Sequence, residues 1–504
     1  TQYISLPQLS LDLMLYKTKN RIELMTDIDQ VLMVERNIRG GLSFVNERYV
    51  DMEQKDSSCE LTYIDYNNLY GMAQSSLLPV GDYKFMSQEE FSQIDWLHVN
   101  TKGETGYILE VDLEYPYHLH FLESHNNFPL APESKKITYD MLSPYSKDCL
   151  AALKGETKYS ATKLVSTLEN KQNYVIHFRN LKLYLDLGLK LTKIHRVMSF
   201  KQSYLFKEYI EYCTEKRKQS VSSFQGNIYK ILSNSLFGKM LECVRDRLSC
   251  RFARNSSRFK RLISDTRIHS FKIFNEEMTC LFVKQQEVLL NKPYAIGFTI
   301  LEHSKHTMFE FFYRVAVPRF NTLALCMTDT DSFSLLVEKK EEDCNKSAIE
   351  ILQDHIDFSN YPRDHVKFDL SRKNKLGYLK DELASDWITK FIALRSKTYA
   401  YIRKERNSSK EQVKKKAKGI SKGYKKEIPF EAYERCLFSI NEETITQYQI
   451  RSINHRVMTN KVRKICFSSF DDKRYILSCG LHSYPYGSCL IQIYGANCKI
   501  CNFM

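Results

Sequence analysis

The segment Met-Thr-Asp-Thr-Asp-Ser, residues 327–332, carries two aspartates one residue apart and directly follows an apolar run. A second acidic segment, Tyr-Ile-Asp-Tyr-Asn-Asn-Leu-Tyr-Gly at 63–71, also follows apolar residues. Short apolar runs of this kind predict buried strands. Because residues i and i+2 of a strand project to the same face, we expect Asp329 and Asp331 to share one side of a sheet, with Asp65 at the end of a neighbouring strand.

Three carboxylates in this arrangement would form a cage of hard oxygen ligands. Such a cage suits a pair of Mg²⁺ ions that also hold substrate phosphates, and Mn²⁺ is the expected substitute. The two acidic segments therefore indicate a nucleotidyl-transfer site with Asp65, Asp329 and Asp331 as metal ligands.

Length and composition set the frame for this site. A chain of 504 residues with 43% hydrophobic and 12% aromatic content predicts a folded protein of two to four domains. The net charge is 74 − 60 = +14, which favours a polyanionic partner, although a basic surface without such a partner is the alternative. Fourteen cysteines without a repeating framework predict reduced thiols in an intracellular compartment. No apolar run predicts a membrane span, and because residue 1 is Thr we expect a fragment or a processed product.

The sequence pattern predicts the following elements. We expect helices over 9–25, over 204–242 with an interruption at Gly226, and over 296–315; we expect strands over 106–113 and 173–184, and short basic strands over 243–295. Within the second helical segment, Lys230, Asn234 and Phe237 fall at i, i+4 and i+7 and share one face. A lysine there can neutralise a triphosphate, an aromatic ring can stack on a base, and Gly238 permits close approach. An ordinary amphipathic helix is the alternative reading of this segment.

These segments resemble the motifs of the protein-primed branch of family B DNA polymerases, and the transposon-encoded Polinton/Maverick members look closest. Five motifs follow the family's order. They are Ile-Arg-Gly-Gly at 38–41, Asp-Tyr-Asn-Asn-Leu-Tyr-Gly at 65–71, Lys-x-x-x-Asn-Ser-x-Phe-Gly at 230–238, Met-Thr-Asp-Thr-Asp-Ser at 327–332 and Lys-Thr-Tyr at 397–399. Each motif alone would be weak, whereas five in order are highly specific.

The resemblance implies an α+β fold of the right-hand type, with an antiparallel palm sheet, helical fingers, a thumb and inserted subdomains. The domains that it implies are a template-contact segment 1–60, palm 61–95, a first insert similar to the terminal-protein region 96–203, fingers 204–242, a second insert 243–295, palm 296–404 and thumb 405–504.

The resemblance also implies a role for each motif residue. Asp65, Asp329 and Asp331 would be catalytic and hold the metal ions. The nucleotide would be bound by Asn68, Leu69, Tyr70, Lys218, Lys230, Asn234, Phe237 and Gly238, with Tyr70 excluding a ribose 2′-hydroxyl. The DNA would be bound by Arg39, Gly40, Gly41, Ser332, Lys397 and Tyr399.

The function that the resemblance implies is a DNA-directed DNA polymerase in the replication of a viral, plasmid or transposable element. Its expected partners are template-primer DNA, dNTPs and a terminal protein primer, with no membrane, and the expected location is the nucleus or the site of element replication. The family's proofreading exonuclease has acidic motifs that the residues before 38 do not supply, so we expect none in this chain.

Two other functions stay open at this stage. A catalytically idle, DNA-binding remnant of a mobile element would keep the fold and the basic groove. A reverse transcriptase would usually carry two adjacent aspartates, where this chain has Asp-Thr-Asp.

The Cys498-x-x-Cys501 pair could bind zinc with Cys479, Cys489 or His482. We find no second pair with ligand spacing, so a zinc site is the less favoured interpretation.

Overall fold

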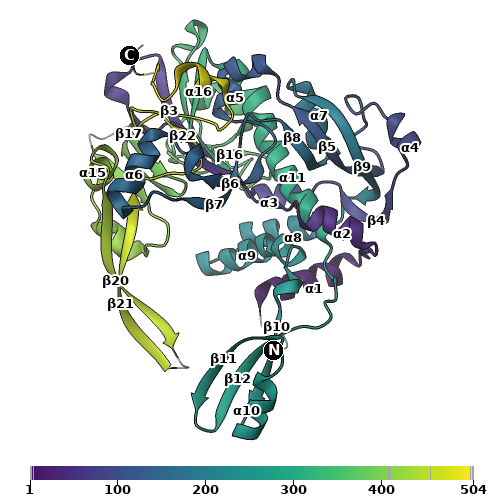
Figure 1. The fold of residues 1–504 in the computed structure, drawn as a ribbon. Helices are drawn as coiled ribbons and strands as arrows, with labels where there is room; N and C mark the ends of the chain where they lie inside the picture. The colour runs from purple at the N-terminus through teal and green to yellow at the C-terminus, as the bar shows by residue number, and fades with distance from the viewer. Residues whose placement is uncertain (1–2, 4, 406–409, 454–455, 500, 502–504) are drawn as a thin grey trace.

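A six-stranded sheet forms the centre of the molecule (Figure 1). The computed structural model describes residues 3, 5–405, 410–453, 456–499 and 501, so parts of the expected segments 1–60 and 405–504 lie outside the described residues. The strands, in spatial order, are β1 (Ser43–Val45), β13 (Thr322–Asp329), β14 (Ser332–Glu338), β3 (Cys59–Tyr66), β16 (Leu379–Asp381) and β15 (Ile356–Asp357). All neighbours are antiparallel except β15 and β16, which are parallel. Both predicted acidic strands, β3 and β13, are confirmed.

The register of this sheet brings the two acidic segments together. Ser332 lies opposite Asp65 on β14 and β3, and Ser43 lies opposite Asp329 on β1 and β13. The Tyr66 N–H donates to the carbonyl of Asp331 over 2.8 Å, which closes the ladder at the acidic end. Segments more than 250 residues apart in sequence are thus fixed side by side by main-chain hydrogen bonds.

One expectation about this hairpin is wrong. Asp329 ends β13 but Asp331 does not continue the strand, because the chain reverses at Thr330 and Asp331 before β14 begins at Ser332. Thr330 has φ +73°, a left-handed conformation, and the Asp331 N–H donates back to the Asp329 carbonyl over 2.9 Å. The two aspartates therefore converge through a tight turn and not through strand alternation.

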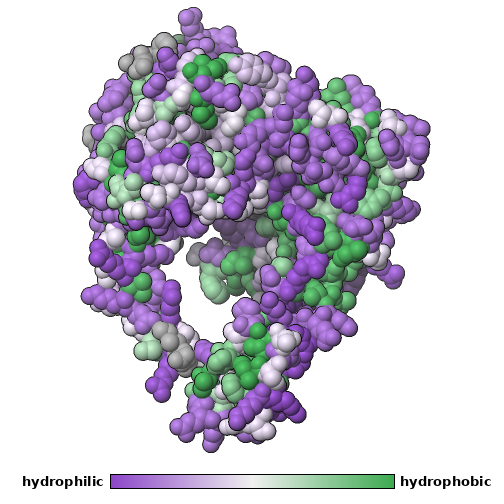
Figure 2. Space-filling model, in the orientation of Figure 1, coloured by the Kyte–Doolittle hydropathy of each residue, from purple (hydrophilic) through white to green (hydrophobic). Residues whose placement is uncertain are grey.

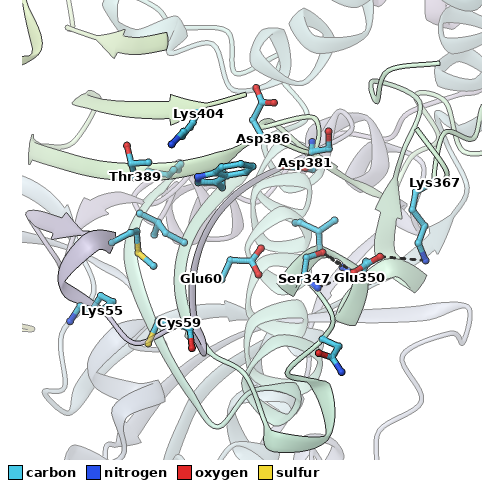
Figure 3. A pocket seen from close by; sticks show the side chains of 18 of the residues that line it. Lys55, Cys59, Glu60, Ser347, Glu350, Lys367, Asp381, Asp386, Thr389 and Lys404 are labelled. Carbon is cyan, nitrogen blue, oxygen red and sulfur yellow. Dashed lines mark hydrogen bonds and ion pairs between the residues drawn. The ribbon is translucent and has the colours of Figure 1, made fainter. Parts of the chain in front are cut away.

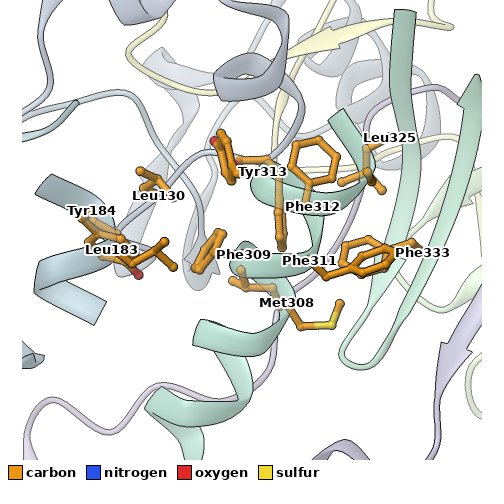
Figure 4. Close-up of a cluster of buried hydrophobic side chains, with 14 of the residues drawn as sticks. Leu130, Leu183, Tyr184, Met308, Phe309, Phe311, Phe312, Tyr313, Leu325 and Phe333 are labelled. Carbon is orange, nitrogen blue, oxygen red and sulfur yellow. The ribbon is translucent and has the colours of Figure 1, made fainter. Parts of the chain in front are cut away.

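The main hydrophobic core joins the central sheet to a long helix, α11 (Tyr294–Glu310), which confirms the helix expected over 296–315. The helix continues as a π-helical turn, Phe311–Ala316, and then as α12 (Val317–Arg319). Figure 4 shows its aromatic side chains packed toward β14, and Phe311 lies 5.5 Å from Phe333 between ring centroids. The wide π turn directs successive aromatic rings into the same core.

The helices α1 (Leu6–Thr18), α8 (Lys207–Lys218) and α9 (Ser223–Met240) pack together beside the sheet. The predicted interruption of the 204–242 segment is misplaced: the break falls between α8 and α9, where the Ser222 hydroxyl caps α9 by accepting from the Gln225 N–H. Gly226 lies inside α9. Helix α1 is shorter than the expected 9–25, because Lys19 adopts a left-handed conformation after it.

A four-stranded antiparallel sheet follows the first acidic segment in the chain. Its order is β4 (Leu78–Phe85), β9 (Lys190–Ser203), β5 (Thr105–Glu114) and β8 (Lys171–His177). The strand expected over 106–113 is confirmed. The strand expected over 173–184 is only half right, because His177 accepts from the Arg179 N–H and caps α7 (Phe178–Asp186). Small elements complete this region: α2 (Ile28–Glu35), α3 (Leu69–Gln74), α4 (Gln88–Ser92), α5 (Glu123–Asn127), β6 (Glu133–Thr138), α6 (Pro144–Lys154) and β7 (Ser160–Val165).

Two arms project from the body on either side of an opening (Figures 1 and 2). One arm is a sheet of β10 (Leu248–Ala253), β12 (Met278–Lys284) and β11 (Ile268–Asn275) with α10 (Ser256–Ile263), so the short strands expected over 243–295 are accompanied by a helix that was not expected. The other arm is the long hairpin of β20 (Glu442–Ile453) and β21 (Arg456–Ser468).

The C-terminal part of the chain forms a second four-stranded sheet together with the early strand β2 (Tyr49–Asp51). This sheet of β19 (Glu411–Lys416), β18 (Thr398–Lys404), β17 (Trp387–Arg395) and β2 carries α15 (Phe430–Phe438) on its surface. Helices α13 (Ala348–Ile351) and α14 (Lys422–Glu427), the hairpin β22 (Tyr475–Ile476) and β23 (Ser483–Tyr484), and α16 (Cys489–Tyr494) complete the fold. Among the described residues, no helix combines the length and the apolar composition needed to cross a bilayer.

Arg48 joins this C-terminal part to the central sheet. Its side chain is 1% exposed, and its guanidinium donates to the carbonyls of Gly480 (2.8 Å), Leu394 (3.1 Å) and Ser469 (2.5 Å). Three carbonyls from three segments would lose their partner if this one side chain were removed.

We expect Arg48→Met to lower the free energy of unfolding by about 3–5 kcal/mol, because removal of the buried guanidinium would leave three buried carbonyl acceptors without a donor. Chemical denaturation followed by circular dichroism measures this loss. Arg245→Met is the control, since Arg245 forms a half-exposed ion pair with Glu35 at 2.9 Å and should cost less than about 1 kcal/mol. Equal losses in the two variants would contradict the structural role of Arg48.

Candidate functional site

Three carboxylates meet at one end of the central sheet. Burial raises the pKa of Asp65, and the charges of Asp331 and Glu382 raise it further. Burial also raises the pKa of Asp331, with Asp329 as the next cause. The positive charge of Lys230 opposes both shifts. The cluster is thus a partly buried group of like charges with too little compensating charge, which is the environment that a bound divalent cation stabilises.

The donor set of the cluster fits Mg²⁺. Carboxylate oxygens from Asp65, Asp329 and Asp331 are hard ligands, and three protein carboxylates leave coordination positions for water or substrate phosphates. The fold therefore places all three residues that the sequence assigned to the metal site at one end of the sheet, near enough for their charges to interact.

Gly41 supports the turn that carries two of the carboxylates. A Cβ at Gly41 would lie 2.5 Å from the Thr330 side chain and 3.1 Å from the Tyr70 hydroxyl oxygen, so only glycine allows this close packing. The Thr330 N–H donates to the carbonyl of Leu42 over 2.6 Å. Gly40 has no atom within 4 Å of the position that a Cβ would take, so its open side faces free space.

The Arg39 side chain does not reach the surface, which contradicts the expectation that it binds DNA. It is 6% exposed, its guanidinium lies 3.9 Å from the ring centre of Tyr174, and it donates to the carbonyl of Val175. The Arg39 carbonyl in turn accepts from the Lys305 ammonium over 3.0 Å. Arg39 therefore anchors the glycine segment within the core.

Tyr70 and Phe237 form a stacked aromatic pair between α3 and α9. Their ring centroids lie 4.3 Å apart with an interplanar angle of 20°. Burial raises the pKa of Tyr70 to about 12, and the charge of Asp331 contributes to that rise. Tyr70 thus lies close enough to the carboxylates to respond to their charge, and it keeps its phenolic proton at neutral pH.

Asn68 and Gly71 depend on each other at the start of α3. Asn68 has φ +52°, and its side-chain oxygen accepts from the Gly71 N–H over 3.1 Å, which caps the helix. A Cβ at Gly71 would lie 2.3 Å from the Asn68 amide nitrogen. Asn68 is thus a helix cap that presents α3 beside the site. The Leu69 side chain, at 1% exposure, belongs to the core, and the expected nucleotide contact of Leu69 stays a prediction.

Helix α9 presents its predicted residues toward the same side of the molecule. Lys230 is exposed, and its charge lowers the pKa of both Asp65 and Asp331. Asn234 accepts from the Ser233 hydroxyl over 3.3 Å. Gly238 has no atom within 4 Å of a Cβ position, so this face of the helix is open. Lys218 is exposed in the last turn of α8.

The Lys397 side chain forms an ion pair with Asp329. Lys397 has φ +63° at the tip of the β17–β18 hairpin, which aims it at the acidic cluster. Tyr399 and Ser332, which were expected to bind DNA, are 2% and 1% exposed. The Tyr399 and Tyr63 hydroxyl oxygens lie 2.8 Å apart, and the Tyr63 hydroxyl donates to Ser332 over 3.4 Å. Both residues thus support the sheet from within, and Tyr399 also lines the cleft beside Asp329, so the expected DNA contacts of Tyr399 and Ser332 stay predictions.

A lysine-rich cleft of about 220 Å³ adjoins the carboxylates. Its lining joins Asp329 to the basic segment after β18 and consists of Asp329, Lys397, Tyr399, Lys416, Ala417, Lys418 and Lys425. A groove with this charge suits a phosphate backbone that must end at the metal site.

A separate cavity of about 660 Å³ lies elsewhere (Figure 3). It is lined at the opposite end of β3 by Cys59 and Glu60, five or more residues before Asp65, a separation of roughly 17 Å along a strand. The carboxylate cluster and not this cavity is the candidate site.

Sequence reasoning missed Glu382, and of the lysines that line the cleft it assigned only Lys397 individually to DNA. Glu382 raises the pKa of Asp65, and its N–H donates to the carbonyl of Tyr63 over 2.9 Å. The pairing of β16 with β3 brings Glu382 close to Asp65, and no local sequence pattern predicts that pairing. For Lys416 and Lys418, the basic run 414–418 was a usable signal.

The comparisons with known proteins agree with this geometry. Residues 1–240 match the family model described as DNA polymerase type B, organellar and viral. No curated protein sequence matches the chain.

Similar solved structures include Phi29 DNA polymerase in three states. The ternary complex with primer-template DNA and incoming nucleotides gives a TM-score of 0.58 at 16% identity, the orthorhombic crystal form 0.56 at 17%, and the post-translocation binary complex with primer-template DNA 0.55 at 16%. Each match covers 92% of this chain and 68% of the Phi29 chain. The expected α+β right-hand polymerase fold with antiparallel sheets is thereby confirmed. The chain is thus similar to the organellar and viral type B DNA polymerase family over residues 1–240, and to Phi29 DNA polymerase in its fold.

Proposed function

We propose that this chain is a DNA-directed DNA polymerase that adds dNTPs to a primer 3′-hydroxyl by a two-metal-ion mechanism. The observation that carries the proposal is the convergence of Asp65, Asp329 and Asp331 from two distant segments onto one sheet end. A remnant free of selection for catalysis has no reason to retain three mutually repelling, partly buried carboxylates.

The metal site would be held by Asp65 and Asp331, with Asp329 assisting from the same hairpin. Bound Mg²⁺ would lower the pKa of the primer hydroxyl and offset the charge on the triphosphate, and Mn²⁺ would substitute. The carboxylates themselves fix the positions at which a hydroxyl and a phosphate can meet. Lys397, paired with Asp329, limits the negative charge of the metal-free site.

The nucleotide would lie between α3 and α9. Lys230, which is exposed and lowers the pKa of Asp65, would contact the phosphates, and Lys218 would add positive charge in the last turn of α8. The Tyr70 ring, held by its stack on Phe237, would lie under the sugar and exclude a 2′-hydroxyl. Asn234 and the open face at Gly238 would border the new base pair.

Template-primer DNA would run through the lysine-rich cleft, with Lys397, Lys416 and Lys418 against the primer phosphates. Gly40, and Gly41 through its backbone, would border the template. We assign the palm to 61–95 and 296–404, the fingers to 204–242, the thumb to 405–504, the inserts to 96–203 and 243–295, and the template-contact segment to 1–60. The two arms beside the opening in Figure 2 lie in the second insert and the thumb.

We place this activity in the replication of a viral, plasmid or transposable element, at the site where that element replicates. The first insert would meet a terminal protein primer. The match to an organellar and viral family supports this setting.

Primer extension with dNTPs and Mg²⁺ tests the proposed function. We expect extension by the unchanged protein, and a loss of about 10³-fold or more in Asp331→Ala and Asp329→Ala, equivalent to about 4 kcal/mol in the activation barrier. The control Asp112→Ala removes a carboxylate that is paired with His195 at 2.8 Å on β5, and it should extend normally.

Equal extension by all four proteins would remove the catalytic assignment. An unchanged protein that binds primer-template DNA but extends nothing would favour the idle remnant instead.

Removing the Tyr70 ring should relax sugar selection. We expect Tyr70→Ala to raise ribonucleotide incorporation relative to dNTP incorporation by about 10-fold or more, because the ring no longer fills the space beside C2′. Tyr70→Phe keeps the stack on Phe237 and is the control that should retain selection. An unchanged sugar ratio in Tyr70→Ala would show that this contact is misassigned.

Asp65→Asn should stabilise the metal-free protein. The pKa of Asp65 is raised in the folded state, so between its unfolded and folded values the folded state binds more protons, and the free energy of unfolding falls as pH rises. Removing the charge should raise Tm by on the order of 1–3 °C near pH 8 and by less near pH 5, where the carboxyls are partly protonated. Scanning calorimetry in a chelating buffer measures both values.

Added Mg²⁺ should then raise the Tm of the unchanged protein and leave that of Asp65→Asn almost unaltered. Asp112→Asn is the control. Because the pKa of Asp112 is lowered in the folded protein, removal of its charge should not stabilise the protein. A lower Tm for Asp65→Asn in metal-free buffer at both pH values would contradict the repulsion argument.

A further inference from the structure

We propose a structural zinc site near the C-terminus, formed by Cys479, His482, Cys498 and Cys501. One ligand atom from each of the four residues lies within 4.8 Å of all the others. The sequence interpretation that Cys498-x-x-Cys501 has no second pair with ligand spacing is wrong, because Cys479-x-x-His482 is that pair. Two x-x-spaced pairs are the usual form of a structural zinc site.

The distances match a tetrahedron around one ion. The His482 Nδ1 lies 3.4 Å from each of the three sulfur atoms, and the Cys498 and Cys501 sulfurs lie 3.5 Å apart. Zinc bond lengths of about 2.3 Å to sulfur and about 2.0 Å to nitrogen give tetrahedral edges of about 3.8 Å between two sulfurs and about 3.5 Å between sulfur and nitrogen. A disulfide would bring two sulfurs to about 2.0 Å, whereas Cys479, Cys498 and Cys501 are all free thiols.

The histidine is oriented for metal binding by a carboxylate behind it. The His482 Nε2 lies 3.1 Å from the Glu47 carboxylate, and both side chains are largely buried. A proton on Nε2, shared with Glu47, leaves the lone pair of Nδ1 directed at the three sulfurs. This carboxylate–histidine pairing is the outer-shell arrangement that supports zinc ligands.

The backbone around the cysteines is also prepared for thiolates. The Leu481 and His482 N–H groups lie 3.4 and 3.5 Å from the Cys479 sulfur as donors, and the Cys501 N–H donates to the Cys498 sulfur over 3.4 Å. Donors aimed at two sulfurs stabilise negative charge on them.

The four ligands come from two segments that the fold holds together. The first pair lies in the turn of the β22–β23 hairpin, where Gly480 has φ +73°, and the second pair follows α16. The Ser478 N–H donates to the carbonyl of Ala496 over 2.8 Å and links the two segments. Glu47 and Arg48 contact the hairpin turn from the segment that follows β1, so zinc would fasten the end of the chain to the central sheet.

The sulfur-rich ligand set selects the metal. Thiolates with one imidazole in a tetrahedron favour zinc over Mg²⁺, which prefers oxygen. With all four ligand atoms within 4.8 Å, the site has room for one ion, whereas a two-iron cluster would separate ligands bound to different irons. Four protein ligands fill the tetrahedron, so the ion would be structural and would not bind substrate.

Metal analysis of the full chain tests the proposal. We expect one zinc per chain by mass spectrometry after dialysis against a weak chelator, and loss of most of it in Cys498→Ser. Cys489→Ser is the matched control, because Cys489 is a buried cysteine of the same region outside the cluster and should retain the zinc. Zinc absent from the unchanged protein, zinc retained by Cys498→Ser, or iron with sulfide in its place would each overturn the proposal.

Two further measurements do not depend on the folding of Cys498→Ser. Cobalt added to the zinc-free, reduced protein should give the intense visible bands and thiolate charge transfer of a tetrahedral sulfur-ligated ion, and weak octahedral bands would overturn the assignment. Glu47→Gln should keep the ligands but weaken zinc binding about 10–100-fold in competition with a chelator. An unchanged affinity would overturn the supporting role of Glu47, and none of these readouts requires polymerase activity.

Discussion

The mutual repulsion of Asp65, Asp329 and Asp331 is the constraint around which the central part of the molecule is arranged. Main-chain hydrogen bonds hold these segments together: the β3–β14 ladder aligns Ser332 with Asp65, and the Asp331 carbonyl in the turn after β13 accepts from the Tyr66 N–H. Backbone ladders and the aromatic core beneath them must therefore supply the free energy that the acidic cluster costs. This explains why Ser332 and Tyr399, which the resemblance assigned to DNA binding, are largely buried, where their hydroxyls and that of Tyr63 connect β3, β14 and β18. A bound cation would return part of that free energy, so metal binding and the stability of the sheet are linked.

A second set of contacts fixes the turn itself. In α11, the buried Lys305 lies 3.2 Å from the Glu302 carboxylate and donates to the carbonyl of Arg39. The Arg39 side chain stacks on Tyr174, and two residues later Gly41 packs against Thr330 between the two aspartates. A buried ion pair is poor evidence for stability by itself, but here each member also holds a defined backbone group. These contacts connect a core helix to the turn that carries Asp329 and Asp331, so a shift of α11 would alter the positions of these two aspartates.

The sequence predicted the parts of the site that lie in continuous segments. Apolar runs identified β3 and β13, and helical spacing grouped Lys230, Asn234 and Phe237 on α9. It failed where a residue's environment comes from elsewhere in the chain. Arg39 was assigned to DNA because its segment resembles a family motif, and only the fold shows Tyr174 and Val175 enclosing its side chain. The helix beginning at Phe178 was missed because its cap, His177, is not a common capping residue. The turn at Thr330 was missed because its left-handed conformation is rare for a β-branched residue.

The two proposed metal sites differ in a way that follows from their ligands. The carboxylate cluster offers three hard oxygen donors and is open toward a lysine-rich cleft, so its ions would keep positions for water, a primer hydroxyl and phosphates. The Cys479–Cys501 cluster offers three sulfurs and one nitrogen, closed around a single position, and leaves none. Loss and rebinding of the metal ion would therefore cost little free energy at the carboxylate cluster and much more at the Cys479–Cys501 cluster. Loss of zinc would expose the thiolates and release the β22–β23 hairpin, which contacts Glu47 and Arg48. Since the segment 46–48 directly follows β1, which pairs with the strand that ends at Asp329, the closed site would help to hold the edge of the sheet on which the open site is built.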